Sequence, residues 1–388
     1  MRPADLPPLT TDEQAHGVRV RGALLARIRS NGGWIAFSDF MKFALYEPGL
    51  GYYSAGTRKF GADGDFITAP DLTPLFARCV AHQVADILRE SGGREVVEFG
   101  AGTGSLAVGV MRALAERGLA PERYSIVEVS ADLRERQREH VLASLGAQAG
   151  RVRWLDELPA TPLHGVLLAN EVLDAFPVER FHVTQGRVER LGVALAGDEL
   201  IVVARPAPPE LEAAVRALPI MSEEGYESEI CPMLSGWMGS VAPLIARGVL
   251  LVMDYGLPRA HYYHPERRQG SLICHFRQRA HADPFQRIGL QDITAWVDFT
   301  AVAEAADSAG LDVLGFTTQA QFLLAAGLEG ELTALAENAG PERQQILHAA
   351  KRLLLPGDMG EAFKVMALGR GIAEPLAGFA LRDLRHTL

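Results

Sequence analysis

A glycine-rich turn near residue 100 constrains this chain more than any other segment. The turn reads Glu98-Phe99-Gly100-Ala101-Gly102-Thr103-Gly104, follows the β-type run Val96-Val97 and opens a helical pattern. Glycines at alternate positions let the backbone turn tightly between a strand and a helix, and they let a ligand approach the backbone closely. The helix start then offers free N–H groups and the positive end of the helix dipole. The pattern therefore predicts a ligand site at the end of the first strand of an α/β sheet.

The residues around this turn narrow the class of ligand. Glu98 stands two residues before the first glycine, where a carboxylate can bind a cationic amine. A ligand with an amino-acid head and a nucleoside tail fits that pairing, and S-adenosylmethionine is such a ligand. The dinucleotide pattern needs Gly or Ala at position 105, where Ser105 stands, so a nicotinamide cofactor is disfavoured. A phosphate loop would end in Gly-Lys-Ser/Thr, which is absent, and a purely structural glycine turn is the remaining alternative.

Composition and charge exclude several kinds of partner. The 388 residues are 48% hydrophobic and 22% charged, with a formal net charge of −10. Because phosphate neutralisation needs a basic face, no nucleic-acid partner is expected, whereas a basic protein or peptide is a compatible substrate. No apolar run approaches the ~20 residues of a membrane helix, so stable membrane insertion is not expected. The first residues lack a signal- or transit-peptide pattern and the three cysteines form no C-x-x-C, which favours a cytoplasmic location.

From residue 94 onward, short apolar runs alternate with helical patterns. Continuous runs of this kind fit strands that are buried on both faces of a parallel sheet. The predicted strands are residues 94–99, 124–127, 152–155, 165–169, 249–253, 311–316 and 363–368. The helix after the glycine turn should bury one apolar stripe, formed by Ala107, Val110, Met111 and Leu114.

The remaining segments interrupt this rhythm. They are expected to form a flexible arm (1–17), a helical stretch broken at Asn31-Gly32-Gly33 (18–45), a small β insertion (178–232), a long loop (257–292) and Leu/Ala-rich helices (319–355). The expected domains are an N-terminal arm and helical/loop cap (1–90), a cofactor-binding half (91–177), an insertion with β and helical segments (178–248) and a C-terminal half with a substrate loop and helical insertion (249–388).

Each early strand ends in an acidic or polar residue. In open α/β sheets ligands bind at the carboxyl ends of the strands, so these residues should gather around the glycine turn. Glu128, after the second strand, stands where an acid bonds ribose hydroxyls, and Asp156, after the third, could accept from an adenine amino group. The alternative is that these acids are the solvated ends of strands.

The segment Asn170-Glu171-Val172-Leu173-Asp174 follows the fourth strand, beside the expected position of a transferable methyl group. Attack of a nitrogen on a sulfonium carbon needs no metal, but it needs a dry pocket and a carboxylate or carbonyl that orients N–H donors. On a helical turn Glu171 and Asp174 would share a face and could clamp a guanidinium. The alternative for Asp174 is a helix cap. Asp254, at the end of the fifth strand, is expected to make structural hydrogen bonds.

A group of histidines in the long loop raises the question of a metal. The candidates are His261, His264, Cys274, His275 and His281. Their spacing lacks a partnering C-x-x-C, and no Glu completes H-E-x-x-H, so no metal site is predicted. A loop that faces the substrate is the favoured interpretation.

Several motifs together resemble the MidA family of class I S-adenosylmethionine-dependent methyltransferases, over residues 20–370. Two of them are far more specific than the glycine turn, which many methyltransferases share: Gly64-Asp65-Phe66-Ile67-Thr68-Ala69-Pro70 and Asn170-Glu171-Val172-Leu173-Asp174-Ala175. The others are Tyr46-Glu47-Pro48-Gly49, Gly51-Tyr52-Tyr53, Asp254-Tyr255-Gly256, Asp292-Ile293-Thr294-Ala295 and Val297-Asp298-Phe299. The sequence departs from the expected pattern at Trp296, at the edge of the implied substrate pocket, where a smaller or polar residue is expected.

The resemblance implies a fold, a cofactor and a reaction. The fold would be α/β and Rossmann-like, with a seven-stranded, mostly parallel sheet, an N-terminal helical and loop cap and inserted segments. The implied cofactor is S-adenosylmethionine, contacted by Glu98, Gly100, Gly102, Gly104, Glu128, Asp156 and Thr68. The implied catalytic residues are Glu171, Asn170 and Asp174. The implied reaction is ω-N methylation of a protein arginine, which in mitochondrial relatives lies on a subunit of respiratory complex I, the NADH–quinone oxidoreductase.

Two other functions stay open at the level of sequence. One is methylation of a different nitrogen acceptor, and the other is a complex I assembly factor that binds the cofactor with little turnover. A bacterial-type cytoplasmic member is implied, and a homo-oligomer is compatible with the sequence. The sequence does not specify the acceptor protein or the number of methyl groups added.

Overall fold

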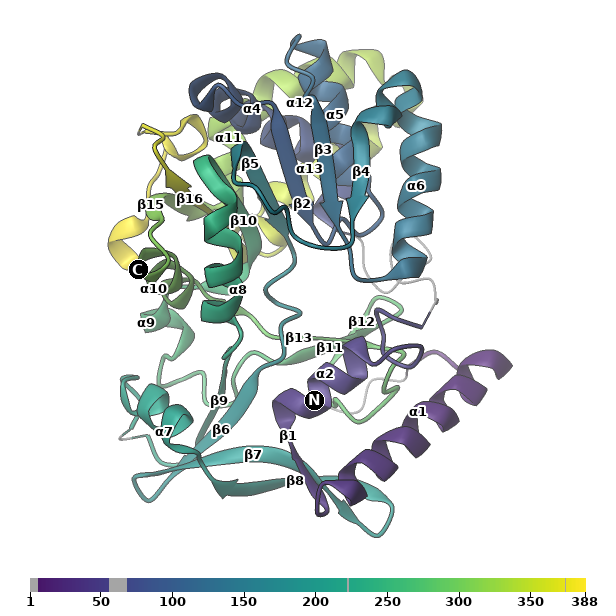
Figure 1. Cartoon of the computed structure of the whole chain (residues 1–388), viewed down its shortest axis with the longest axis vertical. Coiled ribbons are helices and arrows are strands. Elements are labelled where there is room, and N and C mark those ends of the chain that lie inside the picture. The colour runs from purple at the N-terminus through teal and green to yellow at the C-terminus, as the bar shows by residue number, and fades with distance from the viewer. Residues whose placement is uncertain (1–5, 56–67, 222, 374) are drawn as a thin grey trace. The chain divides into compact units, whose positions relative to one another are not determined.

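The computed structural model describes residues 6–55, 68–221, 223–373 and 375–388, and the chain divides into two compact units (Figure 1). The first unit takes its residues from three stretches of sequence, 1–66, 174–234 and 258–296. The second unit consists of residues 67–173, 235–257 and 297–388. Each unit has its own hydrophobic core.

The second unit is built on a mostly parallel sheet. Its strands are β2 (Glu95–Phe99), β3 (Arg123–Val127), β4 (Val152–Leu155), β5 (Leu163–Asn170), β10 (Ile245–Leu257), β15 (Asp312–Thr318) and β16 (Phe363–Arg370). They lie in the order β15-β16-β10-β5-β2-β3-β4, and the short β14 (Val297–Asp298) pairs with the end of β10. In this order β16 runs opposite to the other strands: its pairs with β15 and β10 are antiparallel, and the remaining neighbours pair parallel. The predicted class of sheet is confirmed, and the carboxyl ends of β2, β3, β4 and β5 lie along one edge.

Helices cover this sheet and supply most of its core. They are α3 (Ala69–Leu72), α4 (Pro74–Ser91), α5 (Ser105–Glu116), α6 (Ala131–Leu145), α8 (Leu234–Val241), α10 (Phe299–Ser308), α11 (Gln319–Ala325), α12 (Leu328–Asn338), α13 (Arg343–Leu354) and α14 (Met359–Ala362). The apolar stripe predicted on α5 is buried in full. Burying a side chain of this size contributes about 1.5–3 kcal/mol, so packing fixes the helix that begins at the glycine turn.

The first unit combines N-terminal helices with two small antiparallel sheets. Its helices are α1 (Thr11–Ser30), α2 (Phe37–Tyr46), α7 (Pro209–Arg216) and α9 (Arg259–Tyr262). One sheet contains β1 (Trp34–Ala36), β6 (Glu179–Thr184), β7 (Arg187–Ala196), β8 (Glu199–Pro206) and β9 (Tyr226–Ile230). The other has the order β12-β11-β13, formed by β11 (Ile273–Phe276), β12 (Arg279–His281) and β13 (Asp292–Thr294).

Two expectations about this unit were wrong, and two are confirmed. Helix α1 already begins at Thr11, because Thr10 and Glu13 form a reciprocal capping box that the expected flexible arm did not allow for. The predicted long loop, residues 257–292, contains α9 and the hairpin formed by β11 and β12, and it ends where β13 begins; β13 pairs with β11 across residues 282–291. The β insertion is present, and the helical stretch does break at Gly32 and Gly33, which have φ of 72° and 84°. Within the described residues no helix is both long and apolar enough to cross a membrane.

Candidate functional site

The glycine turn joins β2 to α5 at the carboxyl edge of the sheet. Gly100, Gly102 and Gly104 have φ of 60°, 54° and 83°, a region that other residues rarely adopt. A Cβ at Gly102 would meet no protein atom within 4 Å, whereas one at Gly100 would lie 3.3 Å from the Val172 side chain. Gly104 is the N-cap of α5 and provides no side-chain cap. The space beside Gly102 therefore admits a ligand against the backbone, as the implied cofactor requires.

Glu128 lies directly after β3 and is buried. Its Oε1 accepts from the Ser130 N–H at 2.9 Å, and its Oε2 accepts from Gln137 Nε2 at 3.0 Å. The same Gln137 amide nitrogen lies 3.0 Å from the Gly102 carbonyl oxygen, to which it donates. Gln137, which the sequence reasoning missed, therefore fixes the Glu128 carboxylate relative to the glycine turn. This position suits the predicted role of Glu128 toward a ribose.

Glu98 is the penultimate residue of β2, and its side chain lies in the protein interior. Its Oε2 accepts from the Tyr124 hydroxyl at 2.6 Å, and its side chain is almost fully buried. Burial and, to a lesser extent, the Glu128 charge raise the pKa of Glu98 to about 7, although the Tyr124 hydrogen bond opposes this. A nearby ligand ammonium would stabilise the ionised form, so Glu98 is suited to an amino-acid head.

Asp71, on α3, connects Thr68, which was predicted to contact the cofactor, to the glycine turn. Its Oδ2 accepts from the Thr68 hydroxyl at 2.9 Å, and its Oδ1 accepts from the Thr103 hydroxyl at 2.6 Å. Sequence reasoning missed Asp71, although it directly follows the Gly64–Pro70 motif. Residues 64–67 of that motif lie outside the described residues.

Glu171 directly follows β5 and has an unusual backbone. Its φ is 52°, in the left-handed region, and its N–H donates to the Met253 carbonyl at 2.9 Å. For a residue with a long side chain this conformation is uncommon, and such residues cluster at functional sites.

The surroundings of the Glu171 carboxyl disfavour its negative charge. Burial raises the pKa of Glu171 to about 8, and the Asp254 and Asp71 charges add to the effect. Hydrogen bonds from the Asn170 amide and the Ala69 N–H oppose the rise without cancelling it. A cation beside the carboxyl would reverse the balance, because opposite charge stabilises the ionised form.

The two neighbours of Glu171 have different roles. Asp254 is fully buried; its Oδ2 accepts from the Val172 and Leu173 N–H groups at 3.2 and 2.9 Å. Its Oδ1 accepts from the Tyr255 N–H at 2.9 Å, which confirms the structural role expected for it. Asn170 Nδ2 donates to Glu171 Oε1 at 3.2 Å, and among the described residues the buried Asn170 Oδ1 has no hydrogen-bond partner. This unpaired oxygen beside Glu171 is suited to accept a hydrogen bond from a ligand N–H.

Asp174 requires a correction. No helix begins between residues 171 and 178, all of which are described, so neither the shared helical face with Glu171 nor the helix cap exists. The chain instead turns there, because Asp254 binds the N–H groups that precede Asp174. Glu171 belongs to the second compact unit and Asp174 to the first.

In the first unit, Asp174 lies among aromatic and acidic groups. Its carbonyl accepts from the Ala295 N–H at 3.0 Å. Tyr53 donates to Asp292 Oδ1 at 3.1 Å, and burial followed by the Asp292 charge raises the pKa of Tyr53, with Asp174 contributing. Tyr52 is a fully buried member of the unit's core. The ring of Trp296, the residue that departs from the family pattern, packs against the Arg267 guanidinium at 4.9 Å.

Asp156 is the most exposed of the predicted site residues. It follows β4, its side chain is 88% exposed, and it forms an ion pair with Arg134. Its expected contact with an adenine amino group stays a prediction. Among the described residues, no group of three or more His, Cys, Asp and Glu side chains could hold a metal ion.

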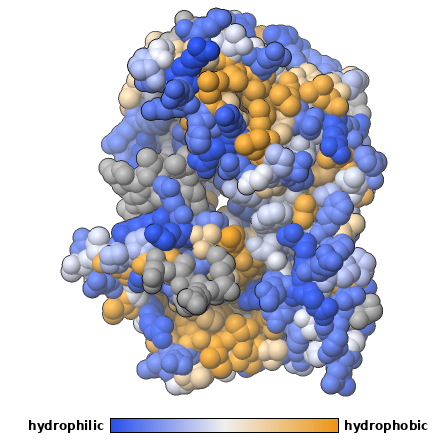
Figure 2. Space-filling model, turned by 180° about the vertical axis from the view of Figure 1, so that it is seen from behind, coloured by the Kyte–Doolittle hydropathy of each residue, from blue (hydrophilic) through white to orange (hydrophobic). Residues whose placement is uncertain are grey.

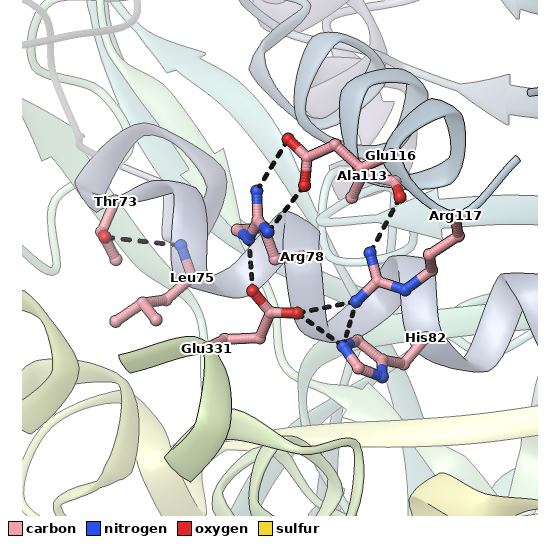
Figure 3. A network of polar contacts seen from close by, with 8 residues as sticks. All are labelled: Thr73, Leu75, Arg78, His82, Ala113, Glu116, Arg117 and Glu331. Carbon is pink, nitrogen blue, oxygen red and sulfur yellow. Dashed lines mark hydrogen bonds and ion pairs between the residues drawn. The ribbon is translucent and has the colours of Figure 1, made fainter. Parts of the chain in front are cut away.

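A second polar cluster, centred on the buried Glu331, lies between α4, α5 and α12 (Figure 3). At its centre Glu331 accepts from Arg78, and from Arg117 and His82 at 2.6 Å each. Arg78 also donates to Glu116, and Arg117 donates to the Ala113 carbonyl at 2.8 Å. Every charged group of this cluster has a partner of opposite sign close by, so we interpret it as a structural tie between helices.

Comparison with known proteins and the geometry of the site indicate the same class of protein. The family model described as "Putative S-adenosyl-L-methionine-dependent methyltransferase" matches residues 79–317. A Drosophila melanogaster protein named protein arginine methyltransferase NDUFAF7 homolog, mitochondrial, is 28% identical over 406 residues, covering 95% of this chain and 90% of that protein. The Homo sapiens protein arginine methyltransferase NDUFAF7, mitochondrial, is 28% identical over 378 residues, covering 89% and 82%.

Two solved structures from Burkholderia thailandensis share the fold along the whole chain. One is bound to S-adenosyl-homocysteine; its TM-score is 0.95 and its identity 43%, over 99% of this chain and 100% of that one. The other, a native structure, has a TM-score of 0.92 and 42% identity over the same shares.

Proposed function

This chain belongs to the family of S-adenosyl-L-methionine-dependent methyltransferases that its sequence matches, and we propose that its acceptor is an arginine side chain of a protein. The family membership bears out the resemblance drawn from the motifs, and the cofactor is S-adenosylmethionine. The arginine acceptor is supported by the names of the relatives and by the chemistry around Glu171.

The observation that carries the proposal is the state of the Glu171 carboxyl. It lies beside Asn170 at the carboxyl edge of the sheet, and burial, together with the charges of Asp254 and Asp71, raises its pKa to about 8. A guanidinium would remove this penalty, since it brings a delocalised positive charge and several N–H donors in one plane. A neutral acceptor would not.

The residues of the site would bind the acceptor and orient its nitrogen for methyl transfer. When bound, S-adenosylmethionine supplies an electrophilic methyl group. The Glu171 carboxylate would accept a hydrogen bond from one N–H of the arginine acceptor. The side-chain oxygen Asn170 Oδ1, which has no partner among the described residues, would accept a hydrogen bond from a second N–H. Two acceptors in fixed positions hold one nitrogen in line for attack, which is where proximity contributes most to rate.

The proton balance also points to Glu171. Methylation of a guanidinium nitrogen replaces one N–H, so one proton must leave the acceptor. The Glu171 carboxylate, ionised while the cation is bound, is placed to take that proton at its Oε atom. Burial of the carboxyl, which raises its pKa in the ligand-free protein, favours the neutral form once the proton has been taken up.

The proposal extends to the acceptor protein. The family resemblance supports a subunit of the NADH–quinone oxidoreductase, and the net charge of −10 favours a basic segment. Asp174 remains a proposed contributor to acceptor binding, from within its cluster in the first compact unit.

The test is transfer of labelled methyl groups from S-adenosylmethionine to a lysate that lacks the protein's own copy, with mass spectrometry of the labelled residue. We expect label on arginine with the wild type and labelling at least about 10²-fold slower with Glu171→Gln. Cofactor affinity should be kept in Glu171→Gln and lost in Gly102→Val, in which a side chain fills the space beside the glycine turn. Glu139→Gln, at an exposed position on α6, is the matched control.

Three outcomes would change the proposal. Label on lysine or histidine would replace the acceptor class. Cofactor binding without any transfer would favour an assembly factor. Loss of cofactor binding in Glu171→Gln would assign Glu171 to the cofactor instead of the acceptor.

A further inference from the structure

Strand β8 forms an open edge of the larger sheet in the first unit. It pairs antiparallel with β7 over eight residues, from Glu199 opposite Ala196 to Pro206 opposite Glu189, without a register shift. Among the described residues no strand pairs with its other edge. Regular edges of this length are normally blunted by a bulge or a cover, because their unpaired N–H and C=O groups can bind another strand.

The side chains of β8 are unusually apolar for an open edge. Ile201 and Val202 are 38% and 43% exposed, on opposite faces of the strand. Figure 2 shows hydrophobic side chains gathered over the part of the first unit where Figure 1 draws β7 and β8. An apolar centre on an unpaired edge is the pattern of a strand that pairs with a further strand.

Two charges of opposite sign flank this apolar centre. Glu199 and Arg205 are both exposed, and neither takes part in an ion pair within the described part of the chain. Arg205 lies opposite Arg190 on β7, a like-charge neighbour whose own guanidinium is bound to Glu179. Arg205 contacts the face of Trp34 instead, at 4.6 Å. The two ends of β8 therefore carry opposite charges, Glu199 and Arg205, and neither charge has an ion-pair partner within the described residues.

We propose that β8 pairs antiparallel with β8 of a second copy of this chain, about a two-fold axis at Val202. In this register Val202 lies opposite Val202 of the other copy, Ile201 opposite Val203, and Glu199 opposite Arg205. Two cross-strand ion pairs then close the two ends of the apolar centre. Pro206, which has no N–H to donate, falls outside the paired segment.

The charge pattern selects this register among the two-fold alternatives. Paired residues must share a face of the sheet, so the axis can shift only by whole residues to Ile201 or Val203. With the axis at Ile201, Glu199 would face Val203; with the axis at Val203, Arg205 would face Ile201. Only the axis at Val202 satisfies both charges. A contact of one strand pair is small compared with a standard interface, so the dimer should form reversibly as concentration rises.

The first experiment is sedimentation of the full chain over a range of concentrations. Glu199→Arg alone and Arg205→Glu alone place like charges opposite each other at both ends, so each should raise the dimer Kd at least about tenfold. An equimolar mixture of the two variants places Arg opposite Glu at both ends and should associate like the wild type. Glu139→Arg, the same charge change on α6, should leave the dimer Kd unchanged.

The second experiment reads the register by oxidation to a disulfide. In the proposed pairing the two copies of residue 202 lie directly opposite, about 4.5–5.5 Å apart at Cα, which a disulfide can bridge. Val202→Cys should therefore form a covalent dimer, and Ile201→Cys should do so far less. The native cysteines give little background, because Cys79 and Cys274 are buried and Cys231 is half-buried.

The results that overturn the proposal are distinct. A chain that sediments as a monomer at all concentrations, or a dimer that both charge reversals leave intact, excludes pairing through β8. Failure of the mixed variants to associate excludes the Glu199–Arg205 register even if each variant folds. Efficient cross-linking at residue 201 instead of 202 assigns a different axis. Binding of an added strand peptide by a monomeric chain would make β8 a peptide site instead of a self-association site.

Discussion

Two buried glutamates of the second unit illustrate opposite ways of placing a carboxyl group. Burial alone would raise the pKa of Glu331, but hydrogen bonds from Arg78, His82 and Arg117 outweigh it and lower the pKa to about 2. At Glu171 burial raises the pKa, and the nearby charges of Asp254 and Asp71 raise it further, to about 8. One carboxylate has its cations within the fold, and the other is surrounded by charge of its own sign.

The difference separates structural from functional charge. The cations around Glu331 come from α4 and α5, so their attraction ties α12 to the rest of the unit (Figure 3). Glu171 instead combines a left-handed backbone with an unfavourable charge. Strained backbones and strongly shifted pKa values cluster at functional sites, and a cationic acceptor would compensate for the unfavourable charge of Glu171.

The largest effect should follow from removing the charge of Glu171. Glu171→Gln should lower kcat/KM for methyl transfer about 10²–10⁴-fold, the usual contribution of a positioned proton acceptor. The cofactor Kd, measured by calorimetry, should stay within a factor of two or so of the wild type. Activity close to that of the wild type would show that the two glutamates do not differ in function.

Removing the charge of Glu331 should act on stability instead. Glu331→Gln leaves Arg78 and Arg117 without their shared carboxylate and should cost about 3 kcal/mol in the free energy of unfolding, measured with denaturant. Glu116→Gln is the matched control, since the Glu116 side chain is 54% exposed and its pair with Arg78 should contribute less than about 1 kcal/mol. A cost no larger than that of the control would mean that the cluster is not a structural tie.

The two glutamates should also give opposite dependences of stability on pH. The folded-state pKa of Glu331 is lowered, so its stabilisation is present above its ordinary pKa and is lost as the pH falls toward 2. The folded-state pKa of Glu171 is raised, so its contribution is complete at low pH and is lost as the pH rises through 8.

Glu171→Gln should therefore stabilise the ligand-free protein at pH 9, by up to about 5 kcal/mol, and by less than about 1 kcal/mol at pH 5. Thermal unfolding of both proteins across this range measures the difference. A variant less stable than the wild type at pH 9 would contradict the unfavourable charge inferred for Glu171.

Asp156 provides the smallest expected effect. Because its side chain is 88% exposed, Asp156→Asn should change the free energy of unfolding by less than about 0.5 kcal/mol. If it accepts from the adenine amino group, the variant should raise the cofactor Kd about fivefold, the value of one hydrogen bond. An unchanged Kd would remove Asp156 from the cofactor site.

The sheet of the second unit could be predicted because its signals are local. The turn from residue 98 to 104 and the apolar runs after residue 94 each specify a neighbouring element, and parallel strands between helices allow few arrangements. The pairing of β11, β12 and β13 was not predicted, because strands of three or four residues are too short to show an alternating pattern. The turn between β11 and β12, Arg277-Gln278, also lacks the Gly or Asn that marks a hairpin. The start of α1 was missed because the expected arm took no account of the reciprocal cap of Thr10 and Glu13.

The candidate site was predicted only in part, for the same reason. The strand ends located Glu98, Glu128, Asn170 and Glu171 along one edge. The positions of Asp71, Tyr124 and Gln137 depend on tertiary contacts that no local pattern records. The high pKa of Glu171 results from what surrounds the carboxyl, and spacing along the chain carries no information about it.

The most direct test of this account is the pH dependence of kcat/KM for methylation of an arginine acceptor. The free enzyme must ionise Glu171 to bind the cation, so kcat/KM should fall about tenfold per pH unit below a break near pH 8. The residual activity of Glu171→Gln should lack this break. A wild-type profile that stays level from pH 6 to pH 9, or the same break in Glu171→Gln, would contradict the claim that the Glu171 carboxyl receives the acceptor.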